Sequence, residues 1–241
     1  MSKSVPSSLY RRFFTPKSET SIKGGASNNV ESLFKLISEK KTFFLLIFAN
    51  LFIQLGVTYY TMQNTDTKKI KNNYWLLIFS IFAILLVLVF IPMPTYVKVP
   101  IFLAFSYSLG LLLSNIKTEK NEKQINLALE GTLSIFGAMV LVGLGLLAGG
   151  IKLGYKFGLF LFIALLILII TRLISRFSDS LSSMQLGLSI FGIVLFSLYL
   201  IYDTNVIFRR DYSGDFITAS LDYYLDILNL FLNLLNLDDS A

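Results

Sequence analysis

The sequence predicts an all-α membrane protein with seven transmembrane helices, and three observations support this fold class. Hydrophobic residues make up 54% of the 241 residues, whereas a soluble domain needs a larger polar surface. They occur in long apolar runs, each close to the roughly 20 residues that a helix needs to cross a bilayer. Short charged segments separate these runs, so we interpret the net charge of +6 as a topology signal and expect no nucleic-acid partner.

The first segment, residues 1–40, is predicted to be a flexible, basic, cytosolic N-terminal tail. Residues 1–30 are rich in Ser, Lys, Thr, Asn and Gly, a composition typical of unfolded chain. The start is polar, so no cleavable signal peptide is predicted. An excess of positive charge on this segment favours a cytosolic N-terminus. The residues that carry it are Lys3, Arg11, Arg12, Lys17, Lys23, Lys35, Lys40 and Lys41.

The apolar runs that follow predict a transmembrane domain over residues 41–237. They are Thr42–Met62, Tyr74–Ile91, Val99–Ile116, Ile125–Ala148, Tyr155–Ile174, Met184–Phe208 and Ile217–Leu237. Pro92, Pro94 and Pro100 are expected to separate the second run from the third, because proline interrupts helical hydrogen bonding. Seven crossings would place the C-terminus opposite the N-terminus and the Arg209–Arg210 loop in the cytosol.

Residues spaced by four indicate how some of these helices pack. Small residues at this spacing let helix backbones approach closely, and polar residues at this spacing form hydrogen bonds between helices. The small sets are Ser106, Gly110 and Ser114 in the third run and Gly145 and Gly149 in the fourth, and the polar set is Asn50, Gln54 and Thr58 in the first. We expect helix packing at all three.

The composition excludes several kinds of chemistry. The chain has no cysteine and no histidine, which removes disulfides, thiolate ligands, imidazole ligands and the usual proton switch near neutral pH. A response to pH would therefore depend on carboxylates. No Walker loop or dinucleotide fingerprint is present, so we expect neither nucleotide-driven pumping nor a bound cofactor.

The last apolar run carries a polar face. Asp222, Asp226, Asn229, Asn233 and Asn236 are spaced 4, 3, 4 and 3 residues apart, which places them on one side of a helix. Either this helix crosses the membrane inside the bundle and its polar face lines a path, or it lies at the membrane surface with that face toward water. The polar face lacks Lys and Arg, which favours the buried, spanning helix.

Two aspartates are the main candidate site. Asp203 lies near the end of the sixth run and Asp226 lies well inside the seventh, so the antiparallel helices could place both at similar depth. Two carboxylates within hydrogen-bond range share a proton and respond to pH, and their oxygens also suit calcium. Alternatively, Asp203 is a solvated residue at a helix end. Asp222 is a possible lining residue of the path, but it lies nearer the loop and we expect it to be solvated there. Glu130 either lines the same path, with Asn229 and Asn233, or reaches the membrane interface.

The end of the chain resembles the transmembrane Bax inhibitor motif family. The matching segments are Ile201–Tyr202–Asp203–Thr204 and Tyr224–Leu225–Asp226–Ile227–Leu228–Asn229–Leu230–Phe231, with weaker similarity near Gln54 and Gly110. This resemblance implies six helices around a central, C-terminal seventh. It also implies a calcium leak in an endoplasmic reticulum, Golgi or bacterial plasma membrane, protection from cell death, and a pH-responsive latch formed by Asp203 and Asp226.

The sequence departs from the family pattern in the second and fourth apolar runs. Members carry an arginine in the second helix that pairs with the latch, but Tyr74–Ile91 has no charged residue. Lys98 or Arg209 could replace it only from the loops, and Glu130, which the family pattern lacks, could add an ion ligand.

Three functions compete at this point. The first is a pH-sensitive calcium leak channel that regulates calcium homeostasis and inhibits apoptosis, with lipid and calcium ions as partners. The second is a non-conducting membrane protein that suppresses cell death by binding other membrane proteins of that pathway. The third, an intramembrane aspartyl protease, is disfavoured because Tyr212–Ser213–Gly214–Asp215 lacks the first glycine of the Gly-x-Gly-Asp motif, and no Pro-Ala-Leu follows. We therefore expect no enzymatic activity.

Overall fold

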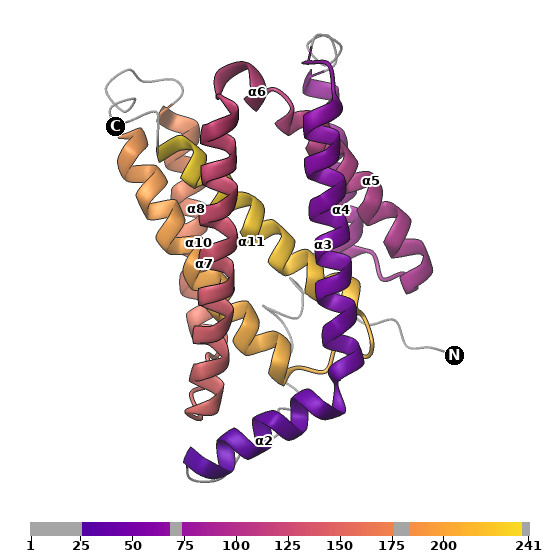
Figure 1. The fold of residues 1–241 in the computed structure, drawn as a ribbon, viewed down its shortest axis with the longest axis vertical. Coiled ribbons are helices and arrows are strands. Elements are labelled where there is room, and N and C mark those ends of the chain that lie inside the picture. Colours follow the sequence, from indigo (N-terminus) through magenta and orange to yellow (C-terminus); the bar gives the residue numbers. More distant parts are fainter. Residues whose placement is uncertain (1–25, 68–73, 176–183, 238–241) are drawn as a thin grey trace. The chain divides into compact units, whose positions relative to one another are not determined.

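The computed structural model describes residues 26–67, 74–175 and 184–237, and the secondary structure of these residues is helical (Figure 1). The helices are α2 (Ala26–Glu39), α3 (Lys41–Asn64), α4 (Tyr74–Phe90), α5 (Thr95–Leu113), α6 (Ile116–Glu119), α7 (Glu122–Ala148), α8 (Tyr155–Ser175), α10 (Gln185–Arg209) and α11 (Phe216–Leu237). Each of the seven predicted apolar runs coincides with one long helix, which confirms the all-α fold class.

Within the described residues, five helical segments are long and apolar enough to cross a membrane, so the chain is an integral membrane protein. They are Lys41–Asn64, Thr95–Glu119, Glu122–Ala148, Tyr155–Ser175 and Gln185–Arg209. Helix α4 is apolar but has only 17 residues. Helix α11 has 22 residues, but its aspartates and asparagines interrupt the apolar sequence and it is not among the five. The seven-crossing arrangement stays a prediction.

The described residues divide into two compact units. Unit 1 contains Lys40–Glu122 and Asp211–Tyr224, and unit 2 contains helix α2 together with residues 123–210 and 225–237. Helix α11, drawn in yellow in Figure 1, contributes its first residues to unit 1 and the rest to unit 2.

Close packing of α3 against α5 organises unit 1. A Cβ atom at Gly110 would lie 2.6 Å from the backbone oxygen of Thr58, so only glycine permits this approach. Ser106 and Ser114 are fully buried, as expected for small residues at a helix interface. The ring of Phe102 meets that of Tyr224 edge-on, with ring centroids 5.2 Å apart, which joins the start of α11 to this pair. The packing predicted for the third apolar run is thus confirmed.

In unit 2, α10 packs closely against α7 and α8. A Cβ atom at Gly143 would lie 2.7 Å from Cβ of Thr204, and one at Gly158 would lie 2.5 Å from the hydroxyl of Tyr202. The expectation of close packing at Gly145 and Gly149 is wrong, because both are exposed and a Cβ at Gly145 would meet no atom within 4 Å.

The connection between α7 and α8 is fastened to the end of α10. The side-chain amide of Asn205 accepts a hydrogen bond from the Leu153 N–H (2.9 Å) and donates one to the Ile151 carbonyl (2.9 Å). Arg209 donates to the carbonyls of Leu153 (2.7 Å) and Asn205 (2.9 Å). These side chains satisfy backbone groups that have no helical partner.

Two boundaries differ from those predicted. Residues 26–39 form helix α2, although they fall in the segment assigned to a flexible tail, because Leu33 is buried and gives that helix an apolar contact. Residues 1–25 of the predicted tail lie outside the described residues. Pro100 lies inside α5 and does not separate it from the preceding helix. It is past the first turn, so the Tyr96 carbonyl loses its helical donor, a loss that helices in membranes tolerate because neighbouring groups can satisfy the freed carbonyl.

Candidate functional site: the polar face of helix α11

The two aspartates of the predicted latch are buried in unit 2. Asp203 on α10 is 1% exposed and Asp226 on α11 is 5% exposed. Aspartate is rarely buried in proteins unless it has polar partners, and ionisable residues in membrane helices mark functional positions. Asp203 is therefore not the solvated helix-end residue of the alternative interpretation.

The polar residues of the last run share one helical face, because α11 is helical from Phe216 to Leu237. Most of that face is buried: Asp222 is 5% exposed and Asn233 1%, while Asn229 is partly buried and Asn236 is exposed. The expectation that Asp222 is solvated is wrong. Spacing along a helix reveals which residues share a face but not what covers them, and here the face is covered.

The asparagines of this face turn their amides onto their own helix. Asn229 donates to the Leu225 carbonyl (2.8 Å), and Asn233 donates to the Asn229 carbonyl (2.6 Å). The side-chain oxygen of Asn233 accepts a hydrogen bond of 2.5 Å from Nη2 of Arg172 on α8. A cation, Arg172, therefore contacts this face, a contact that the sequence did not predict.

The remaining predicted site residues are Asp222 and Glu130. Asp222 is assigned to unit 1, whereas Asp203, Asp226, Asn229 and Asn233 are assigned to unit 2. Glu130 on α7 is exposed, as are Ser134 and Gly137 on the same face of that helix. Of the two roles considered for Glu130, contact with the surroundings of the bundle fits this exposure better than lining a path.

Unit 1 holds a separate buried polar network between α3, α5 and the start of α11. Asn50 donates to the Ser220 hydroxyl (2.6 Å), and Ser106 donates to the side-chain oxygen of Gln54 (2.7 Å). The hydroxyls of Thr58 and Tyr224 lie 2.5 Å apart. The hydrogen bonding between helices that was predicted for Asn50, Gln54 and Thr58 is confirmed.

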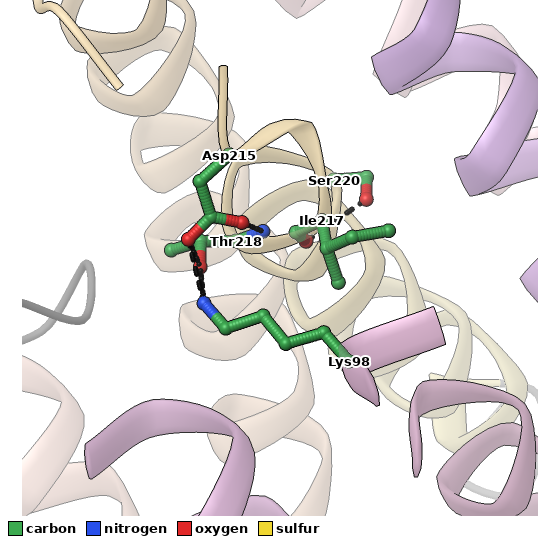
Figure 2. A network of polar contacts seen from close by, with 5 residues as sticks. All are labelled: Lys98, Asp215, Ile217, Thr218 and Ser220. Atoms are coloured by element: carbon green, nitrogen blue, oxygen red, sulfur yellow. Dashed lines mark hydrogen bonds and ion pairs between the residues drawn. The ribbon is translucent and has the colours of Figure 1, made fainter. Parts of the chain in front are cut away.

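A buried ion pair lies at the start of α11 (Figure 2). Nζ of Lys98 donates to Oδ2 of Asp215 (2.6 Å) and to the hydroxyl of Thr218 (2.8 Å). Asp215 caps the helix, because its Oδ1 accepts the Thr218 N–H (3.1 Å) and its Oδ2 accepts the Thr218 hydroxyl (2.7 Å). Figure 2 shows Lys98 extending from α5 to this first turn. In the same turn the Ser220 hydroxyl donates to the Ile217 carbonyl (3.0 Å).

The assignment of Lys98 and Arg209 to loops is wrong. Lys98 lies in the first turns of α5 and is 2% exposed, and Arg209 is the last residue of α10 and is 7% exposed. Both charged side chains have hydrogen-bond partners, which allows these helices to extend beyond the strictly apolar runs. The arginine that sequence rules could have identified is Arg172, since it is ionisable and lies inside an apolar run.

Among the residues that the structure describes, no three His, Cys, Asp or Glu side chains lie close enough to hold a metal ion. Calcium takes six to eight oxygen ligands in its binding sites, and two aspartates would supply only part of such a set. Contact of calcium with Asp203 and Asp226 stays a prediction.

Comparisons with known proteins identify relatives of this sequence. The family described as inhibitor of apoptosis-promoting Bax1 matches residues 35–238. The Golgi anti-apoptotic protein of vaccinia virus strain Lister is 42% identical over 82 residues, 34% of either chain. Protein LIFEGUARD 1 of Arabidopsis thaliana is 32% identical over 139 residues, covering 56% of this chain and 55% of that protein. Bax inhibitor 1 of Schizosaccharomyces pombe is 37% identical over 82 residues, covering 34% of this chain and 31% of that protein.

These alignments span between about a third and just over half of the relatives' lengths. The family match is broader, since it takes in α3 to α11 and includes both aspartates. The chain therefore belongs to the Bax inhibitor family.

Proposed function

We propose that this protein inhibits apoptosis by acting as a pH-sensitive calcium leak, with Asp203 and Asp226 as the latch on the polar face of α11. The observation that carries the proposal is the burial of both aspartates within one unit. Burial of a carboxylate away from water costs free energy, so a buried aspartate in a membrane helix marks a functional position. The names of the vaccinia and yeast relatives support the anti-apoptotic role.

The proposed latch works through a shared proton. Two carboxylates that face each other hold one proton between them, and loss of that proton leaves two negative charges that repel. The separated carboxylates, together with the oxygens of Asn229 and Asn233, would then replace part of the water shell of a calcium ion. Membrane lipid and calcium ions are the partners that this mechanism requires.

Calcium flux into liposomes that contain the purified protein tests the proposal. The unmodified protein should pass calcium at a rate that changes with pH, and the double variant Asp203→Asn, Asp226→Asn should lose that change. Asp211→Asn is the matched control, because Asp211 is an exposed aspartate between α10 and α11. Absence of flux at every pH, or the same pH profile in the double variant, would refute the leak.

A second candidate function is a non-conducting protein that suppresses cell death by binding other membrane proteins of that pathway. The closed hydrogen-bond network of Asn50, Gln54, Thr58 and Tyr224 favours it, because there the buried polar groups act as internal packing contacts. Cell survival under an apoptotic stimulus separates the two functions. Protection that persists in the double aspartate variant supports binding, and protection that disappears supports the leak.

The name of the vaccinia relative supports a proposal about location. We propose residence in an internal membrane, the Golgi or endoplasmic reticulum, if the source is eukaryotic or viral, and in the plasma membrane if it is bacterial. The N-terminus is proposed to face the cytosol, because positive charge is concentrated before α3. Accessibility of N-terminal and C-terminal tags in intact and permeabilised cells tests this orientation.

A further inference from the structure

Arg172 is a cation inside an apolar helix, close to the end of α8 at Ser175. An arginine near a helix end normally extends its guanidinium outward to the membrane interface. Arg172 instead donates from Nη2 to the side-chain oxygen of Asn233, a residue that is only 1% exposed. Its Nε is buried, and among the described residues it has no hydrogen-bond partner. The guanidinium is therefore directed at the polar face of α11.

Asn233 is held in place from three directions. Its oxygen accepts the bond from Arg172, and its nitrogen donates to the Asn229 carbonyl (2.6 Å). On the third side lies Gly192 of α10, where any Cβ atom would overlap the Asn233 side chain. Helices α8, α10 and α11 thus meet at one asparagine, and a larger residue at position 192 would displace it.

This cluster lies between the latch and the C-terminal end of α11. Asp226 and Asn233 are seven residues apart, so roughly 10 Å of helix separates them, with Asn229 between. A cation that moves along this face from Asp226 toward Leu237 must pass the guanidinium of Arg172. A fixed positive charge in a region of low dielectric constant repels a cation strongly.

We propose that Arg172, held by Asn233 in the space that Gly192 leaves, is the charge barrier that closes the polar path to cations at the C-terminal end of α11. The barrier rests on the proposed function in taking the polar face of α11 as an ion path and calcium as the ion. The existence of a charge-selective constriction is independent of which cation crosses the membrane.

The absence of cysteine from the chain allows a direct test. A single cysteine introduced by Asn229→Cys lies behind the barrier, and one introduced by Asn236→Cys lies beyond it, at an exposed position. Purified protein in nanodiscs is treated with cationic and anionic methanethiosulfonate reagents of similar size. The residue at 229 should react more slowly with the cationic reagent than with the anionic one, relative to the residue at 236.

Removal of the charge gives the second measurement. Arg172→Gln should raise the rate of the cationic reagent at position 229 by about tenfold or more and leave position 236 unchanged. Arg172→Lys should keep the barrier, because it keeps the charge. Lys156→Gln is the matched control, since it removes an exposed cation at the other end of α8.

The outcomes separate the barrier from the leak. Equal charge preference at positions 229 and 236 in the otherwise unmodified protein overturns the barrier, even if Arg172→Gln does not fold. An unchanged rate at position 229 in a folded Arg172→Gln protein also overturns it. If the rate rises there but no variant passes calcium into liposomes, the barrier stands and the calcium leak fails. If the rate rises and calcium flux rises with it, both are supported.

Discussion

Removal of either partner of the ion pair between Lys98 and Asp215 should destabilise the protein, but by different amounts. The two side chains are 3% and 16% exposed, so neither charge can regain full hydration when the other is removed. Asp215→Asn keeps a cap on α11 but removes the counter-charge of Lys98. Lys98→Met keeps the length of the side chain and leaves Asp215 with the N–H and hydroxyl of Thr218.

The expected magnitudes follow from what each variant leaves behind. Asp215→Asn leaves the buried Lys98 cation with neutral partners only, and we expect about 3 kcal/mol of destabilisation. Loss of Lys98 leaves a carboxylate that still accepts two hydrogen bonds at a helix N-terminus, where negative charge is favoured, so about 1–2 kcal/mol is expected. The double variant should cost less than the two single changes together.

Reversible unfolding in mixed detergent micelles, titrated with sodium dodecyl sulfate, measures these free energies. Asp211→Asn serves as the control for removing an exposed aspartate nearby and should stay within about 0.5 kcal/mol of the unmodified protein. The reasoning is refuted if Lys98→Met costs as much as Asp215→Asn, or if the two effects simply add in the double variant.

Three further predictions concern packing and the hydrogen-bond networks. Gly110→Ala should lower the free energy of unfolding by about 1–3 kcal/mol, because its Cβ would overlap α3. Gly56→Ala should raise the free energy of unfolding by about 0.5–1 kcal/mol, because its Cβ would meet no neighbouring atom. A change of the same sign in both variants would contradict the packing. Tyr224→Phe should cost about 1 kcal/mol in the same titration, since the Thr58 hydroxyl can still donate to the carbonyl of Gln54 or of Ser106, and no loss would argue against the buried hydroxyl pair. Asn205→Leu should speed hydrogen exchange at the Leu153 amide, and unchanged protection there would show that the amide has another partner.

Helix positions and the shared face of α11 could be predicted from the sequence because both depend on local spacing. The apolar runs gave the long helices to within a few residues, and helical periodicity placed Asp226, Asn229 and Asn233 together. Proline was a less reliable boundary. A proline ends a helix only if the backbone carbonyl that it frees finds no other partner, and α5 continues through Pro100.

Contacts between distant segments could not be predicted in the same way. Lys98 and Asp215 are 117 residues apart, and Arg172 and Asn233 are 61 apart, so no local pattern relates them. The glycines illustrate the same limit, since Gly143 and Gly145 differ by about 200° around α7 and only the former faces α10. Which side of a helix meets a neighbour depends on its rotation in the bundle, which spacing alone does not determine.

The fastening of the α7–α8 connection by Asn205 and Arg209 has a practical consequence for protein engineering. Surface connections are the usual sites for inserting affinity tags or fusion partners, because exposed loops tolerate added residues. Here the carbonyls and amide of Ile151 and Leu153 hold side chains of α10, the helix that carries Asp203. An insertion between Ile151 and Leu153 would break these hydrogen bonds, loosen the end of α10 and so disturb Asp203. A fusion partner intended to aid structure determination should therefore be inserted elsewhere in the chain.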